Sequence, residues 1–74
     1  MAGSPIFGVL RGVVESFDDP RGLGIVRSDD GHDFPFHCTA VADGTRTIEE
    51  GSPVSFEVVA GHLGRWEAAG IVPR

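Results

Sequence analysis

Apolar and polar positions alternate along most of this chain in short runs that glycine, proline and aspartate separate. The alternation has a period of two residues, which is typical of strands with one buried face. No window keeps its apolar residues at the spacing of a helix. The pattern predicts an all-β chain with five strands, at residues 9–17, 21–28, 33–38, 52–60 and 65–73.

The connections between these runs carry turn signals. "DDGHD" joins the second and third runs, and its Asp-Gly pair is a strong hairpin signal. A longer polar stretch, "TAVADGTRTIEEG" (39–51), joins the third and fourth. Because closure removes the exposed edges of so small a sheet, we expect a five-stranded antiparallel β-barrel, one domain over residues 1–74.

The stretch "DFPFHC" at residues 33–38 indicates which side chains face the inside of such a barrel. Alternation places Phe34 and Phe36 on one face and Pro35 and His37 on the other. Because proline lacks an N–H, we expect incomplete strand pairing at residue 35. The expected core consists of Val26, Phe34, Phe36, Val54, Phe56 and Val58.

The composition limits which binding partners and which cellular location we expect. Eleven acidic residues against six basic ones give a net charge of −5, which argues against tight, non-specific binding of nucleic acid. Cys38 is the only cysteine, so an internal disulfide is excluded and a reducing, cytoplasmic location is expected. The first residues contain neither a basic leader nor a long apolar run, so we expect no membrane partner.

Residues suited to catalysis or metal binding do not form a recognisable motif. His37 and Cys38 are neighbours on one strand and point to opposite faces, and neither His32 nor His62 completes a zinc-ligand spacing. The acidic residues lie mainly in turns, and no nucleophile belongs to a recognisable constellation with a base. We therefore expect no enzyme activity, no metal or other cofactor, and no small-molecule substrate.

Two of the runs resemble the nucleic-acid motifs of the cold-shock domain, an OB-type barrel that binds single-stranded RNA and DNA. The family's first motif typically reads Lys-Gly-Phe-Gly-Phe-Ile, and "RGLGIV" (21–26) stands in its place. Its second typically reads Val-Phe-Val-His-Phe, and "FPFHC" (34–38) stands there. The register is gapless from Gly12 to Val41, and "IEEGSPVSFEVVAG" (48–61) resembles the fourth strand. The resemblance implies a barrel of the cold-shock type.

The departures from the family fall on its binding face. In the family, aromatic side chains of the second and third strands stack on bases, each contributing roughly 1–3 kcal/mol. Non-aromatic residues replace them here, at Leu23, Ile25, Pro35 and Cys38, and Ser16 and Glu15 replace a tryptophan and a lysine of the first strand. Phe17, Arg21 and His37 are retained. The resemblance therefore implies weak binding of single-stranded RNA or DNA with strong salt dependence.

The expected contact residues are Phe17, Arg21, Leu23, Ile25, Pro35, His37 and Trp66. Trp66 has no counterpart in the family pattern, and its indole would either stack on a base or close the end of the barrel. An alternative function remains open. Exposed Leu23, Ile25 and Pro35 would also suit a protein partner or a homodimer, in a barrel that kept the fold and lost nucleic-acid binding.

Overall fold

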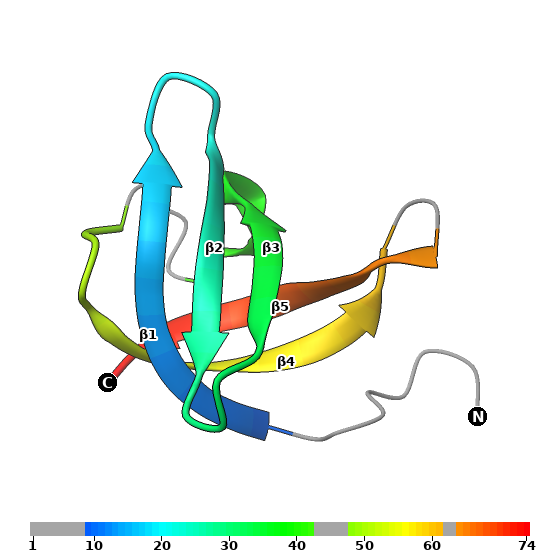
Figure 1. The fold of residues 1–74 in the computed structure, drawn as a ribbon. Coiled ribbons are helices and arrows are strands. Elements are labelled where there is room, and N and C mark those ends of the chain that lie inside the picture. Colours follow the sequence, from blue (N-terminus) through cyan, green and yellow to red (C-terminus); the bar gives the residue numbers. More distant parts are fainter. Residues whose placement is uncertain (1–8, 43–47, 62–63) are drawn as a thin grey trace.

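The computed structural model describes residues 9–42, 48–61 and 64–74 (Figure 1). Its strands form one antiparallel sheet in the order β3-β2-β1-β4-β5, and a short 3₁₀ helix, η1, follows β3. The elements are β1 (Val9–Asp18), β2 (Leu23–Ser28), β3 (Asp33–His37), η1 (Cys38–Ala40), β4 (Pro53–Ala60) and β5 (Trp66–Pro73). The predicted fold class, five antiparallel strands without a long helix, is confirmed. Nothing helical in the described ranges has the length and hydropathy of a transmembrane segment.

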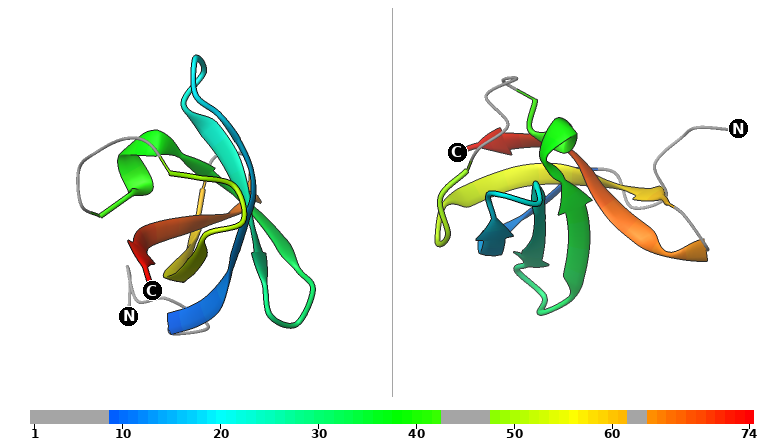
Figure 2. Two further views of the ribbon diagram at one scale, coloured as in Figure 1. Left: turned by 90° about the vertical axis from the view of Figure 1, so that its left-hand side faces the viewer. Right: turned by 90° about the horizontal axis from the view of Figure 1, so that it is seen from above.

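The sheet closes because its two end strands meet. β1, β2 and β3 run side by side, and the β4–β5 hairpin crosses them (Figures 1 and 2). β3 and β5 are in contact, and a parallel bridge pairs Val41 with Ile71, where the N–H of Ala42 donates to the Ile71 carbonyl at 2.8 Å. Within the described residues, the enclosed core consists of Val14, Val26, Phe36, Val41, Val54, Phe56, Val58, Ala68 and Ile71.

The start of β2 differs from the sequence expectation. The run predicted from residue 21 begins as a strand at Leu23, because Arg21 and Gly22 belong to the preceding turn. The N–H of Gly22 donates back to the carbonyl of Asp18 at 2.8 Å, and its φ of 67° lies in the left-handed region, which glycine tolerates best. Arg21 is therefore presented from a turn and not from the strand.

Most of the expected core is buried, with one exception. Val26, Phe36, Val54, Phe56 and Val58 are buried as predicted, whereas Phe34 is only half-buried. The ring of Phe34 packs against Phe56 at a centroid distance of 5.8 Å, but it also lines a surface hollow beside Trp66. The prediction of full burial for Phe34 is wrong, because alternation gives the face of a side chain and not how completely other strands cover it.

Pro35 lies in β3, at the edge of the strand order. At the two ends of the β2–β3 ladder, Ser28 N donates to the His32 carbonyl and Cys38 N donates to the Gly22 carbonyl. Because hydrogen-bonded positions alternate in an antiparallel pair, those of β3 fall at residues 34 and 36, and the nitrogen of Pro35 faces away from β2. Proline at this position therefore removes no hydrogen bond from the ladder. The expected incomplete pairing at residue 35 is wrong, because β2 and β3 pair without a register shift, with Pro35 opposite Ile25.

Candidate functional site

The outward faces of β2 and β3 carry three pairs of cross-strand neighbours. The pairs are Leu23 with His37, Ile25 with Pro35, and Arg27 with Asp33. All three occupy non-hydrogen-bonded positions, where side chains of the two strands approach most closely. The predicted assignment of faces is confirmed, since Leu23, Pro35 and His37 are exposed and Ile25 is half-buried.

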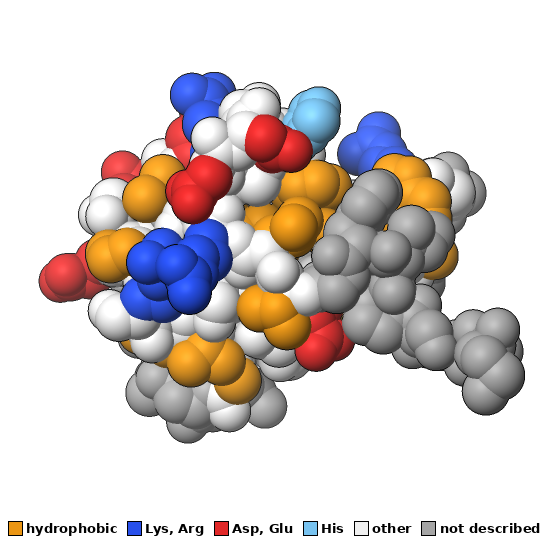
Figure 3. All heavy atoms as spheres, turned by 90° about the horizontal axis from the view of Figure 1, so that it is seen from below, with side chains coloured by type: hydrophobic (Ala, Val, Ile, Leu, Met, Phe, Trp, Pro, Cys, Tyr) orange, Lys and Arg blue, Asp and Glu red, His pale blue; other side chains and the backbone are white. Residues whose placement is uncertain are grey.

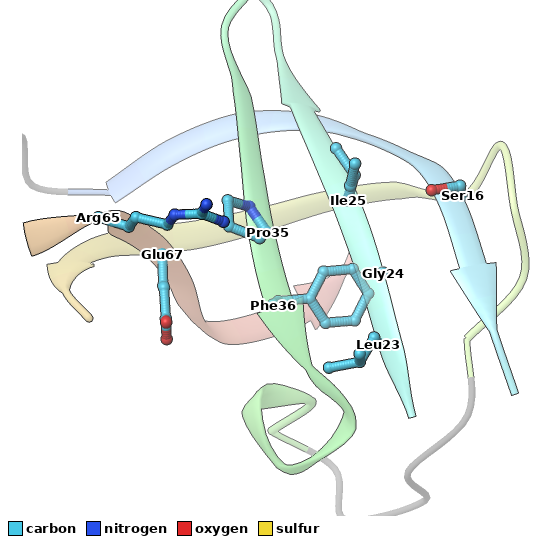
Figure 4. Close-up of a pocket in the computed structure, with 8 residues that line it drawn as sticks. All are labelled: Ser16, Leu23, Gly24, Ile25, Pro35, Phe36, Arg65 and Glu67. Carbon is cyan, nitrogen blue, oxygen red and sulfur yellow. The ribbon is translucent and has the colours of Figure 1, made fainter. Parts of the chain in front are cut away.

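Part of this surface forms a hollow of about 570 Å³, which we call the apolar groove (Figure 4). It is lined by Ser16, Leu23, Gly24, Ile25, Pro35, Phe36, Arg65 and Glu67. Gly24 is required here, because a β-carbon at this residue would come within 2.6 Å of both the Phe36 ring and the Ser16 carbonyl oxygen. This close approach lets the Phe36 ring form part of the groove.

Four of the expected contact residues come together around this groove. Leu23, Ile25 and Pro35 line it directly, and His37 joins Leu23 and Pro35 around an adjoining hollow of about 300 Å³. Leu23 exposes 49% of its surface, a large fraction for an apolar side chain next to other apolar groups. The alternation, combined with the register of the resemblance, predicted that these four side chains would lie together on the outward face.

The other three expected residues lie outside the groove. Phe17 stacks on Phe36 with centroids 5.9 Å apart and an interplanar angle of 6°. Arg21 lies in the β1–β2 turn, with its Nε 3.7 Å from Oδ2 of Asp18. Trp66 is 41% exposed and lines a separate hollow of about 460 Å³, which shares Pro35 and Arg65 with the groove. Trp66 is therefore accessible from solvent and does not fully close the end of the barrel.

The side chain of His37 has a defined hydrogen-bonding pattern. Its Nδ1 accepts the N–H of Thr39 at 3.3 Å and lies 3.0 Å from Thr39 Oγ1. A ring nitrogen that accepts from an amide carries no proton, so we assign the proton of the neutral ring to Nε2. His37 consequently offers a hydrogen-bond donor on the side of the ring that faces away from Thr39.

The third cross-strand pair belongs to a cluster of charges. Arg27 Nη2 lies 3.0 Å from Oε2 of Glu15, and Arg27 Nε lies 3.0 Å from Oδ1 of Asp33. The hydrogen bond from Arg27 lowers the pKa of Asp33, and the same bond, with the charges of both carboxylates, raises the pKa of Arg27. These side chains are well exposed, so solvent screens their attraction. The guanidinium of Arg27 is nevertheless paired with two carboxylates in this cluster.

Arg65 and Glu67 line the groove and were not among the expected contact residues. Figure 4 shows Arg65 extending toward Pro35, while Glu67 is directed away from Arg65. Among the residues that the structure describes, neither side chain forms an ion pair or a hydrogen bond. A sequence signal existed, because the run "RWE" combines both charges with an exposed aromatic residue at the start of the last strand.

Charges of both signs are interspersed on one face of the molecule. Figure 3, the view onto the β2–β3 turn, shows hydrophobic side chains between separate acidic and basic groups, without a continuous basic area among the coloured atoms. No group of three or more His, Cys, Asp or Glu side chains in the described ranges is arranged to hold a metal ion. The chemistry of the site is therefore that of an apolar groove with a few polar groups at its margin.

Comparison with known proteins places this geometry in a family. The family model described as "'Cold-shock' DNA-binding domain" matches residues 10–73. Cold shock protein CspB of Bacillus caldolyticus is 41% identical over 63 residues, which cover 84% of this chain and 94% of that protein. Cold shock protein CspD of Bacillus subtilis is 41% identical over 54 residues, covering 72% and 82%. Among solved structures, drosophila Unr CSD456 matches with a TM-score of 0.73 and 27% identity, over 89% of this chain and 26% of that one.

Proposed function

The chain belongs to the cold-shock domain family, and we propose that it binds single-stranded RNA or DNA weakly, with bases seated in the apolar groove. One observation carries this proposal. Leu23, Ile25 and Pro35, from two neighbouring strands, meet in a single exposed groove at the positions where the family presents aromatic rings. An apolar surface of this kind accepts the face of any base, because every base has a face with low polarity.

The groove supports weak binding because aliphatic groups replace aromatic rings. A base stacked on an aromatic side chain gains roughly 1–3 kcal/mol, and contact with Leu23 or Pro35 lacks the contribution of ring stacking. Phe17 retains its ring, but that ring already stacks on Phe36. Trp66 offers an accessible aromatic surface in the neighbouring hollow, so a second base is expected there.

Two arginines are expected to meet phosphates. Arg65 lines the groove without an acidic partner among the described residues, and Arg21 lies outside it in the β1–β2 turn, paired with Asp18 only at 3.7 Å. For single strands, the slope of log K against log salt is roughly −0.7 for each phosphate that is neutralised, so two contacts predict about −1.4. This slope is smaller than the strong salt dependence expected from the resemblance alone.

A second candidate function rests on the same exposed side chains. Leu23, Ile25 and Pro35 would also suit a protein partner or a second copy of this chain, because contiguous exposed apolar groups often mark such interfaces. Association of that kind would depend little on salt. The two functions therefore differ in their response to ionic strength.

A titration with a matched pair of variants tests the proposal. Leu23→Asp places a carboxylate in the groove, whereas Val72→Asp makes the same kind of change at an equally accessible site on β5, since Val72 is 46% exposed. We expect Leu23→Asp to weaken binding of a labelled single strand at least about tenfold at low salt, from lost apolar contact and added repulsion. Val72→Asp should weaken it much less, and fluorescence anisotropy gives both values.

Two outcomes would count against nucleic-acid binding. Equal losses in the two variants would mean that the groove is not the contact surface. A dimer that forms with rising concentration in sedimentation, without oligonucleotide binding at low salt, would favour the self-associating barrel instead.

A further inference from the structure

Two hollows on the surface meet at a shared boundary. The apolar groove and the hollow beside Trp66 are neighbours, because Pro35 and Arg65 line both of them. Pro35 is exposed on β3, and Figure 4 shows the side chain of Arg65 extending toward it from just before β5. The guanidinium of Arg65 is therefore directed toward the boundary between the two hollows.

Each hollow also carries one carboxylate at its margin. Glu67 lines the apolar groove, and Asp33 lines the hollow beside Trp66. The hydrogen bond from Arg27 lowers the pKa of Asp33, so this carboxyl group is ionised at neutral pH. A carboxylate repels a phosphate but not a neutral base, whereas Arg65 attracts a phosphate. The charges therefore favour a base inside each hollow and a phosphate at the boundary.

The hollow beside Trp66 offers an aromatic surface to a base. The indole of Trp66 is 41% exposed, and the half-buried ring of Phe34 lines the same hollow. Aromatic side chains accept the face of any base. Two bases seated on either side of Pro35 would be neighbours in space, and neighbouring bases of one strand are joined by a single phosphate.

From this arrangement we infer that the binding unit is a dinucleotide. One base occupies the apolar groove, the next base lies on Trp66, and the phosphate that joins them contacts Arg65. The inference rests on the proposed function and adds to it the length of the ligand and the one phosphate that the chain holds between two bases.

The test uses a short labelled deoxyoligonucleotide with two adjacent thymines and abasic residues at all other positions, so the thymines fix the register. One version carries a neutral methylphosphonate linkage between the two thymines. Its control carries the same linkage between two abasic residues, so both strands have equal charge. By anisotropy, we expect the linkage between the thymines to weaken binding roughly five- to tenfold more at low salt. It should also flatten the slope of log K against log salt by about 0.7 more than the control.

A pair of variants attributes this difference to Arg65. In Arg65→Ala the two neutral linkages should have the same effect within about twofold, because the contact that distinguishes them is gone. Arg11→Ala makes the same change in net charge and should keep the difference, since Arg11 lines a separate hollow. Trp66 is the only tryptophan of the chain, so its fluorescence reports on the second base. We expect it to change as the strand with adjacent thymines binds.

The outcomes separate this inference from the proposed function. Equal losses from the two neutral linkages, binding without a change in Trp66 fluorescence, or a full difference that persists in Arg65→Ala would each overturn the dinucleotide unit. Binding of an all-thymine strand without binding of the strand with two thymines would overturn it too, because more bases would then be required. In all these cases nucleic-acid binding would stand. Failure of the all-thymine strand to bind at low salt would overturn the inference and the proposed function together.

Discussion

Single residues determine what the groove offers to a base. Leu23 and Pro35 provide apolar surface without a ring, and Pro35 is compatible with β3 because its nitrogen faces the outer edge of the sheet. Both side chains are exposed, so larger groups at these positions would extend into solvent and not into the core. The weakness of the proposed interaction is therefore a property of the side chains and not of the backbone that carries them.

Restoring two aromatic rings should strengthen binding. We expect Leu23→Phe combined with Pro35→Phe to strengthen binding of single-stranded DNA by roughly 1–3 kcal/mol for each base that stacks. The affinity should rise about tenfold or more in total. Val13→Phe combined with Val72→Phe adds the same rings at exposed apolar positions outside the groove, and should change affinity little. Anisotropy at low salt compares the two double variants. Unchanged affinity in a folded Leu23→Phe, Pro35→Phe protein would mean that stacking is not what limits binding.

Among the elements, β1 occupies the centre of the strand order, between β2 and β4. Gly12 is aligned with Ser28 of β2 on one side and with Val54 of β4 on the other. Figure 1 shows β1 curving through the sheet between these partners. A β-carbon at Gly12 would lie 2.1 Å from the carbonyl oxygen of Arg27, which is backbone and cannot move aside easily.

Alanine substitutions at Gly12 and Gly61 should differ in their cost to stability, because the added methyl group meets backbone at Gly12 and a flexible side chain at Gly61. We expect Gly12→Ala to lower the free energy of unfolding by about 1–3 kcal/mol, the usual cost of forcing extra atoms into a packed site. Gly61→Ala adds the same methyl group against side-chain atoms of Glu67, which can rotate away, and should cost less than about 0.5 kcal/mol. Urea denaturation measures both. Similar losses in the two variants would contradict this account of Gly12.

The sequence predicts features that depend on neighbouring residues better than features that depend on contacts between strands distant in the sequence. Alternation along one strand identified the outward side chains of β2 and β3, because a period of two is set by the local backbone. It could not place Arg65 and Glu67 at the groove, since β5 meets β3 only after the whole sheet closes. For the same reason it overstated the burial of Phe34, whose cover depends on distant strands. The sequence thus indicated Leu23, Ile25 and Pro35, and closure of the sheet brought Arg65 and Glu67 beside them.

The charge of the whole molecule opposes its proposed ligand. The net charge is −5, and acidic neighbours pair with two of the arginines, Arg27 closely and Arg21 at 3.7 Å. Arg65 is the groove residue whose positive charge lacks an acidic partner among the described residues. Because repulsion from the whole chain is screened over about 10 Å at moderate salt, a single well-placed arginine can still hold a phosphate.

Loss of Arg65 should therefore change both affinity and salt dependence. We expect Arg65→Ala to weaken binding of single strands of any sequence and to flatten the slope of log K against log salt by about 0.7, the value for one lost phosphate contact. Arg11→Ala is the matched control, because Arg11 is equally a surface arginine but lines a different hollow, beside Asp29 and Asp30. That variant makes the same change in net charge, so it should shift affinity slightly at low salt and leave the slope unaltered. Anisotropy titrations at several salt concentrations give both slopes. Equal slopes for the two variants would mean that Arg65 attracts the strand only through the overall charge of the molecule, without contacting a phosphate at the groove.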